Sequence, residues 1–151
     1  MMNKLTTTAA LLLLSTWALA ADSVVGFWKT IDDETHEPKS IVQLYEYQGK
    51  RYGRVVDLLK DKQAKAALPG SPAILGLDII WDLTKKGDKY RGGEVLDPQK
   101  GRVYDCQIWL EGDKLILRGS LFGIGRKQVW LPAKDFKGGA TSPTPRKPRL
   151  K

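Results

Sequence analysis

The stretch RVYDCQIWLEGDKLILRG, residues 102–119, decides the fold. Its first half alternates, with Tyr104, Cys106, Ile108 and Leu110 on one side and a mixed, partly polar set on the other. A period of two residues is typical of a β-strand with one buried face. Because a Glu-Gly-Asp turn then leads into a second apolar run, the stretch predicts an antiparallel hairpin.

The same pattern of short apolar runs and glycine turns extends through most of the chain. Most connections take two to five residues, so neighbouring runs should form antiparallel pairs. Alternation also places Ile79, Trp81 and Leu83 on one face. These features predict a single all-β, up-and-down barrel of about eight strands, with a two-sheet sandwich as the alternative. The expected strands are residues 24–31, 40–47, 51–59, 78–83, 89–96, 102–110, 114–119 and 126–131.

One connection, residues 60–77, is longer than the others. Residues 62–68 could form a helical turn or two, which the sequence Pro-Gly-Ser-Pro at 69–72 would stop. At the shorter turn that begins with Asp97-Pro98, we expect Gly101 to adopt the left-handed conformation that ends the loop.

The first residues have the layout of a secretory signal peptide. Lys4 precedes an apolar run at residues 9–14, and the segment ends in Ala-Leu-Ala at 18–20. The run is too short for a membrane span, which takes about 20 apolar residues. We therefore expect cleavage after Ala20 or Ala21 and a protein that is periplasmic or secreted. The predicted divisions are a signal peptide at 1–20, a barrel domain at 21–133 and a basic tail at 134–151.

Most of the positive charge lies in the tail. Of the formal net charge of +8, one unit belongs to Lys4 and five to residues 134–151, which leaves about +2 for residues 21–133. Such a nearly neutral body gives no reason to expect a nucleic-acid partner. Few apolar residues and three prolines predict that the tail is disordered. Its last cations, which could contact an anionic envelope surface, are Arg146, Lys147, Arg149 and Lys151.

Two features near the ends of the predicted barrel resemble lipocalins and their calycin relatives. Gly26-Phe27-Trp28 opens the first strand, and Arg126 opens the last. In lipocalins, a G-x-W tryptophan packs at the barrel base under an arginine from the end of the barrel. The resemblance implies a lipocalin-like barrel in which Trp28 and Arg126 form a structural pair, held by cation–π attraction.

A more specific resemblance covers nearly all of the predicted barrel. Six blocks in order are similar to the bacterial exported family named domain of unknown function 2147: GFWKTIDDET with PKS at 26–40, YGRV at 52–55, GEVLDP at 93–98, GRVY at 101–104, LRG at 117–119, and GR with Trp130 at 125–130. The resemblance implies a signal peptide, a periplasmic location and a calycin-type barrel, and it brings no catalytic residues. The chain departs from the family pattern at residues 120–124, and the basic tail lies outside the match.

The acidic residues near the start of the barrel permit two interpretations. The carboxylates of residues 32–34 and Glu37 could hold a hard cation such as calcium. We favour an acidic loop in which Asp33 and Thr35 close a turn by bonding their own backbone, so no metal or cofactor is expected.

Residues suited to catalysis are few. Asp97 and Asp105 could form a hydrolase pair, but Asp97 is better explained as a turn residue. The only histidine, His36, lies in the acidic loop, so no nucleophile–base pair is visible. The only cysteine, Cys106, alternates with apolar residues, and we interpret it as a small buried hydrophobe rather than a reactive thiol. We therefore do not expect an enzyme.

The leading interpretation is an exported, non-enzymatic binding protein that holds a small hydrophobic or amphiphilic ligand in its barrel. An eight-stranded barrel is either filled by side chains or holds one small ligand, and large aromatic residues suit both cases. The alternative is a structural or interaction protein whose tail docks on anionic lipid or polymer. The tail could also have no partner and only increase solubility. A hydrolase is the least favoured hypothesis. The candidate ligand-binding residues are Tyr45, Tyr52, Trp81, Tyr104 and Leu117.

Export gives the first testable prediction. Protein purified from the cell envelope should have the intact mass of a chain that starts at Ala21 or Asp22, because the Ala-Leu-Ala site directs cleavage there. Recovery of the full-length chain in the cytoplasm would contradict the prediction.

Overall fold

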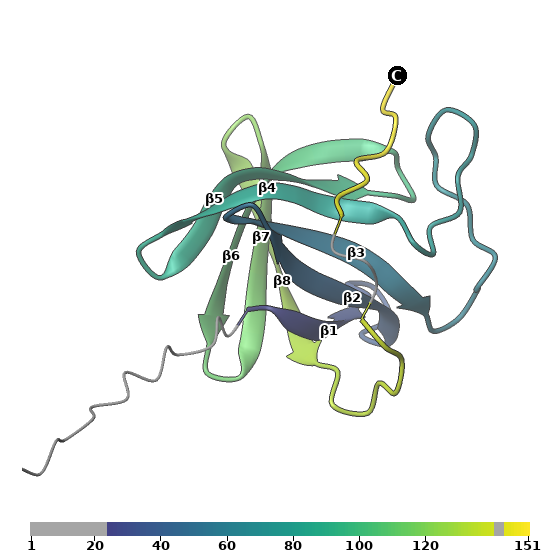
Figure 1. Ribbon diagram of the computed structural model, residues 1–151. Coiled ribbons are helices and arrows are strands. Elements are labelled where there is room, and N and C mark those ends of the chain that lie inside the picture. Colours follow the sequence, from purple (N-terminus) through teal and green to yellow (C-terminus); the bar gives the residue numbers. More distant parts are fainter. Residues whose placement is uncertain (1–23, 141–143) are drawn as a thin grey trace, which may run out of the picture.

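The computed structural model describes residues 24–140 and 144–151, and the predicted signal peptide lies outside this range. Eight antiparallel strands follow one another in chain order and close into one barrel (Figure 1). The strands are β1 (Gly26–Ile31), β2 (Pro38–Tyr47), β3 (Lys50–Leu58), β4 (Asp78–Lys86), β5 (Lys89–Asp97), β6 (Arg102–Glu111), β7 (Lys114–Leu121) and β8 (Ile124–Pro132).

The predicted barrel is confirmed, and each predicted strand overlaps an observed one. Closure comes from β1 and β8, where Trp28 pairs with Pro132 and Lys29 with Leu131. This pairing joins the first strand to the last, so the alternative of a two-sheet sandwich is wrong. No helix among the described residues is long and apolar enough to cross a membrane.

Side chains occupy the interior of the barrel. Residues that face each other across paired strands point to the same side of the sheet. Trp28, Val42 and Val55 form one such inward row across β1–β3. Ile80, Val95 and Tyr104 form another across β4–β6. All of them except Tyr104, which is half-buried and packs against the others, belong to one hydrophobic core that also includes Cys106. Cys106 is 1% exposed, which confirms the buried position predicted for it.

The β4 strand differs from its predicted pattern. Ile80 points inward opposite Gly53 and Val95, so its neighbour Trp81 lies on the outer face, although both side chains are buried. Asp82 then has a φ of 62°, which interrupts the alternation. Because both faces of β4 are covered, a run of apolar residues could not indicate which face is inside.

The long connection also differs from the prediction. In place of a helical turn at residues 62–68, it forms turns and one bridge between Lys65 and Ala73. A short helix is marginal by itself, and here the N–H of Ala67 donates to the carbonyl of Pro98 at 2.8 Å. The left-handed conformation predicted for Gly101 is confirmed, with a φ of 64°. A side chain at Gly101 would collide with the backbone of Ala67, so glycine here allows the turn to pack closely against the long connection.

The C-terminal residues lie against the outside of the barrel. Phe136 packs on Phe27 of β1, with ring centroids 4.9 Å apart. Residues 144–151, called the C-terminal segment below, cross β3 and β4 (Figure 1) and place Leu150 against the core. In the described parts of the tail, residues 134–140 and 144–151, these contacts differ from the disorder predicted for residues 134–151, and residues 141–143 lie outside the described range. The prediction was based on the small number of apolar residues in the tail. Composition gives no information about hydrogen bonds between the main chain of the tail and the barrel.

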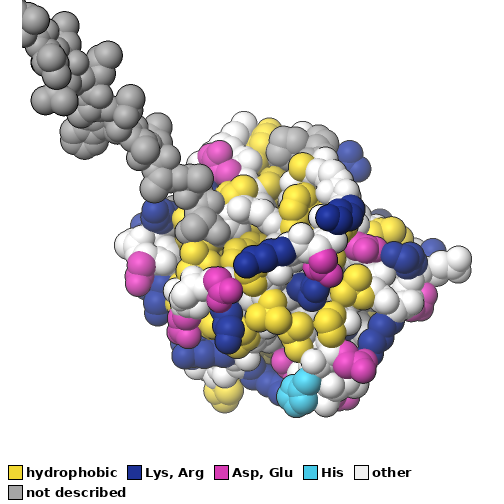
Figure 2. Space-filling model, turned by 90° about the horizontal axis from the view of Figure 1, so that it is seen from below, with side chains coloured by type: hydrophobic (Ala, Val, Ile, Leu, Met, Phe, Trp, Pro, Cys, Tyr) yellow, Lys and Arg dark blue, Asp and Glu magenta, His cyan; other side chains and the backbone are white. Residues whose placement is uncertain are grey.

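Charge on the barrel body is mixed rather than one-sided. On the face shown in Figure 2, Lys and Arg side chains alternate with Asp and Glu around exposed hydrophobic side chains. This distribution agrees with the small net charge computed from the sequence of residues 21–133.

Candidate functional site

A polar network lies on the outer face of β2, β3 and β4. Arg54 of β3 donates from Nε to Asp78 Oδ1 of β4 at 2.7 Å, and from Nη2 to Oδ2 at 3.3 Å. Tyr45 of β2 donates its hydroxyl to Asp78 Oδ2 at 2.8 Å. Strand pairing positions all three groups, because Arg54 lies opposite Asp78 in the β3–β4 register and Tyr45 lies opposite Tyr52, two residues before Arg54, in the β2–β3 register. The network is therefore built from three neighbouring strands and fixed by their backbone.

This network is shielded from water although it lies outside the barrel. The side chains of Arg54 and Asp78 are only 5% and 1% exposed. Burial, followed by the hydrogen bond to Asp78, raises the pKa of the Tyr45 phenol far above its ordinary value. Burial disfavours the Arg54 charge, but the hydrogen bonds and negative charge of Asp78 outweigh this and raise its pKa. We infer from these directions that Tyr45 stays neutral and that Arg54 stays charged.

Aromatic rings surround the network. Tyr45 stacks on Tyr52 with ring centroids 5.6 Å apart, and Tyr52 donates its hydroxyl to Asp82 at 3.1 Å. Trp81 is 1% exposed and donates from Nε1 to Glu94 at 3.1 Å. Arg54, Asp78 and these rings together form the outer aromatic site, which combines apolar surface with one buried donor and one buried acceptor.

The predicted ligand-binding residues do not meet in one cavity. Tyr45, Tyr52 and Trp81 belong to the outer aromatic site. Tyr104 and Leu117 point into the barrel, as their pairing with Val95 and Ile108 requires. The reason is the strand register, which places the two groups on opposite sides of the sheet. Sequence reasoning missed Arg54 and Asp78, because β3 and β4 each carry four charged residues and no local pattern distinguishes the buried pair from the others.

The predicted pair of Trp28 and Arg126 is also not brought together. Trp28 lies opposite Pro132 at the end of β8, and Arg126 lies six residues earlier in that strand. At 3.3 Å per residue the two positions are about 20 Å apart. Because β8 runs antiparallel to β1, only residues from its end reach Trp28. The indole instead donates to the carbonyl of Val24 at 2.8 Å.

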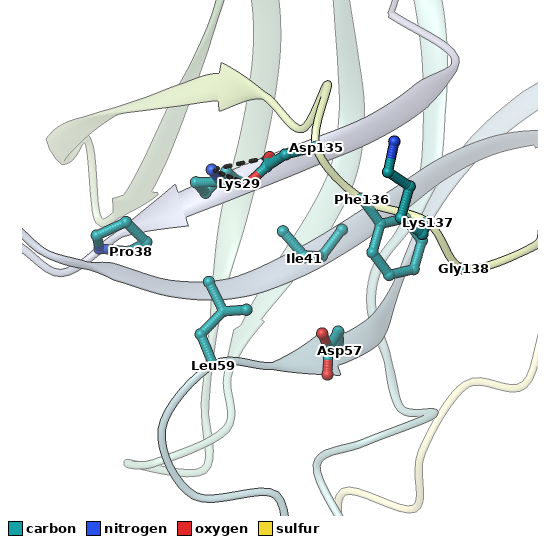
Figure 3. Close-up of a pocket in the computed structure, with 9 residues that line it drawn as sticks. All are labelled: Lys29, Pro38, Ile41, Asp57, Leu59, Asp135, Phe136, Lys137 and Gly138. Atoms are coloured by element: carbon teal, nitrogen blue, oxygen red, sulfur yellow. Dashed lines mark hydrogen bonds and ion pairs between the residues drawn. The ribbon is translucent and has the colours of Figure 1, made fainter.

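An open cavity of about 510 Å³ lies on the outer wall beside β1–β3 (Figure 3). Its apolar lining includes Ile41, Leu59 and Phe136. Lys29 and Asp135 form an ion pair at its edge, with Nζ and Oδ1 3.1 Å apart. A smaller cavity of about 270 Å³ lies near Tyr90. None of the predicted ligand-binding residues lines either cavity.

The tip of the β7–β8 hairpin exposes two large apolar side chains. Phe122 and Ile124 are 93% and 82% exposed. Phe122 and Gly123 form the turn, and their φ angles of 52° and 78° are typical of a type I′ hairpin. Arg126 and Lys127, both exposed, follow directly in β8.

The acidic residues take structural positions. Asp32, rather than the predicted Asp33, closes the first loop by accepting the N–H groups of Glu34 and Thr35, and these bonds lower its pKa. Asp97 accepts the N–H groups of Gln99 and Lys100, as expected of a turn residue.

Comparisons with known proteins agree with this geometry. A structure titled "Protein HP1028 from the human pathogen Helicobacter pylori belongs to the lipocalin family" superposes with a TM-score of 0.63 at 20% sequence identity, over 74% of this chain and 83% of that one. The fold is thus that of a lipocalin-like barrel. The model of a family described as "Uncharacterized protein conserved in bacteria (DUF2147)" matches residues 26–131, and the chain belongs to this family. No curated protein matches the sequence.

The buried ion pair gives a prediction about stability. Substitution Arg54→Met should lower the free energy of unfolding by about 3–5 kcal/mol, because Asp78 would keep a buried charge without its partner. The double variant Arg54→Met/Asp78→Leu should recover most of this loss. Urea unfolding followed by circular dichroism measures both.

A matched control for this prediction is Lys62→Met. The Lys62–Asp57 pair has the same N–O distance of 2.7 Å, but the lysine side chain is 67% exposed. Exposed pairs contribute about 0–1 kcal/mol. Equal losses of unfolding free energy for Arg54→Met and Lys62→Met would show that burial does not make the Arg54–Asp78 pair more important for stability than an exposed pair.

Proposed function

We propose that this protein is an exported, non-enzymatic envelope protein that docks on anionic membrane surfaces through the tip of its β7–β8 hairpin. The observation that supports this most is the exposure of Phe122 and Ile124, at 93% and 82%, on a protruding turn. Two large apolar side chains exposed next to each other on one turn form a candidate interaction surface. The packing of side chains inside the barrel makes a ligand held there a weaker proposal.

Charge near the tip favours a membrane with anionic headgroups. Arg126 and Lys127 are exposed and follow the tip, with Lys127 Nζ 5.4 Å from the centroid of the Trp109 ring. Arg118 is half-buried on the facing strand. Each cation near an anionic membrane contributes about 1 kcal/mol, and burial of each apolar side chain about 1.5–3 kcal/mol. Apolar and electrostatic contributions are therefore of similar size, and binding should weaken with salt without vanishing.

The C-terminal cations are a second source of attraction to the same surface. Arg146, Lys147, Arg149 and Lys151 are all exposed, but Lys147 lies over the Trp81 ring at 5.0 Å and within 3.9 Å of Glu94. Three of the four tail cations named from the sequence are thus available to an anionic surface. The tail that only increases solubility stays an alternative, which the vesicle experiment also tests.

Co-sedimentation of the full-length protein with vesicles tests this function. We expect binding to vesicles that contain phosphatidylglycerol and much less to phosphatidylcholine alone. Phe122→Ser should weaken binding about tenfold or more, because it removes most of one apolar contribution. The control is Leu75→Ser, since Leu75 is also exposed, at 41%, but lies in the long connection.

The outcomes separate the two sources of attraction. Unchanged binding by Phe122→Ser would contradict docking through the hairpin. Loss of binding only in Arg149→Gln/Lys151→Gln would assign docking to the tail. No binding by the wild-type protein at low salt would leave the solubilising tail as the remaining explanation.

The open cavity of Figure 3 favours a second candidate function, the binding of a small amphiphilic ligand. Its volume of about 510 Å³ lies within the usual range of ligand sites, roughly 300–1,000 Å³. Ile41, Leu59 and Phe136 would contact an apolar body, while Lys137 would attract an anionic head, since Lys29 is already paired with Asp135. This proposal keeps the ligand class expected from the sequence but moves it from the interior to the outer wall.

Anilinonaphthalene sulfonate, an anionic and apolar fluorescent probe, tests the cavity. Leu59→Gln should weaken probe binding several-fold, because Leu59 is 40% exposed and lines the cavity. Leu75→Gln, with a matching exposure of 41%, should leave it unchanged. Equal effects of the two variants would contradict the site. Native mass spectrometry of envelope-purified protein would show whether a natural ligand is retained.

A further inference from the structure

The C-terminal segment is held on the outer aromatic site by main-chain hydrogen bonds. Arg54 donates from Nη2 to the carbonyl of Thr144 at 2.8 Å. Arg146 donates its backbone N–H to Asp78 Oδ2 at 2.6 Å. In an extended chain the carbonyl of one residue and the N–H two residues later point the same way. One buried ion pair therefore contacts the backbone of this segment at two positions, independently of its side chains.

The side chains of the segment follow a pattern that suits an aromatic surface. Pro145, Pro148 and Leu150 are half-buried, whereas Arg146 and Arg149 are exposed. Prolines three residues apart match the polyproline II helix, which has three residues per turn. Surfaces lined by aromatic rings bind such Pro-x-x-Pro segments because the conformation loses little entropy on binding.

The surface beneath the segment has the complementary groups. The stacked pair of Tyr45 and Tyr52 lies beside the ion pair, and Leu150 packs against the core cluster that contains both rings. Lys147 extends over the Trp81 ring at 5.0 Å and comes within 3.9 Å of Glu94. The contacts thus include apolar, cation–π and main-chain components within one segment.

The buried ion pair itself calls for an explanation. A barrel does not need a buried charge pair on its outer wall, because well-packed apolar residues often give equal or greater stability. Asp78 accepts bonds from Tyr45 and Arg54 and still accepts the N–H of Arg146. The donor and acceptor are therefore fixed in advance by the strands, as in a site that binds a peptide backbone.

We propose that the outer aromatic site is a peptide-binding site for extended, cationic segments with Pro-x-x-Pro spacing. Its resident ligand is the C-terminal segment of the same chain, which occupies the site until a competing segment displaces it. The site recognises its ligand by a carbonyl and an N–H two residues apart, and by half-buried prolines in the same segment. This inference does not depend on membrane docking or on the cavity of Figure 3.

The test uses the full-length protein and a labelled, acetylated peptide with the sequence of residues 144–151. Arg146→Pro in the protein removes the N–H that Asp78 accepts, so the resident segment should leave the site more readily. Arg149→Pro is a matched control, because it also places proline after proline and removes one charge, while no bond from its N–H to the barrel is lost. Fluorescence anisotropy measures binding of the peptide.

We expect the peptide to bind the Arg146→Pro protein at least tenfold more tightly than the wild-type or Arg149→Pro protein. Conversely, a peptide with Arg146→Pro should bind the Arg146→Pro protein at least tenfold more weakly than the unaltered peptide. Equal binding to all three proteins, or no binding to any of them, would overturn the proposal. A wild-type protein that is dimeric, with an Arg146→Pro variant that is monomeric, would place the segment on a second copy and overturn occupation within one chain.

Discussion

The pairing of β1 with β8 closes the barrel, and the other features of the molecule depend on this closure. The junction is short, since Trp28 pairs with Pro132 and Lys29 with Leu131. Once the sheet is closed, its inner side chains share one limited volume, which residues such as Val42, Val55 and Ile80 occupy. Polar groups in the strands are then left to the outer wall. The chemically distinctive groups of this protein lie there for that reason.

Local patterns in the sequence were sufficient to predict the strands and the barrel. Alternation and glycine turns act within a few residues, so they are visible without the fold. The inner face of β4 was not predictable in this way, because Ile79, Ile80 and Trp81 are all apolar and both faces are covered. The separation of Trp28 from Arg126 already follows from the predicted topology, because the first and last strands of an eight-strand up-and-down barrel run antiparallel and their first residues lie at opposite ends.

The candidate site was less accessible to sequence reasoning than the fold. Tyr45, Tyr52 and Trp81 were selected as aromatic residues, but their position outside the barrel depends on register. The meeting of Arg54 with Asp78 depends on the β3–β4 pairing, which contains two irregularities. Composition indicated a tail too polar to fold by itself. It could not indicate that the main chain of the tail would find a donor and an acceptor on the barrel.

The short junction between β1 and β8 leaves much of β8 as a sheet edge, because the two strands pair only near Leu131 and Pro132. An unpaired edge of this kind can recruit a strand from another molecule and so begin aggregation. Arg126 and Lys127 occupy this edge and are exposed. Charged residues, lysine above all, oppose such pairing, because a second copy would bring like charges together. We therefore expect these two cations to oppose edge-to-edge aggregation of the folded protein.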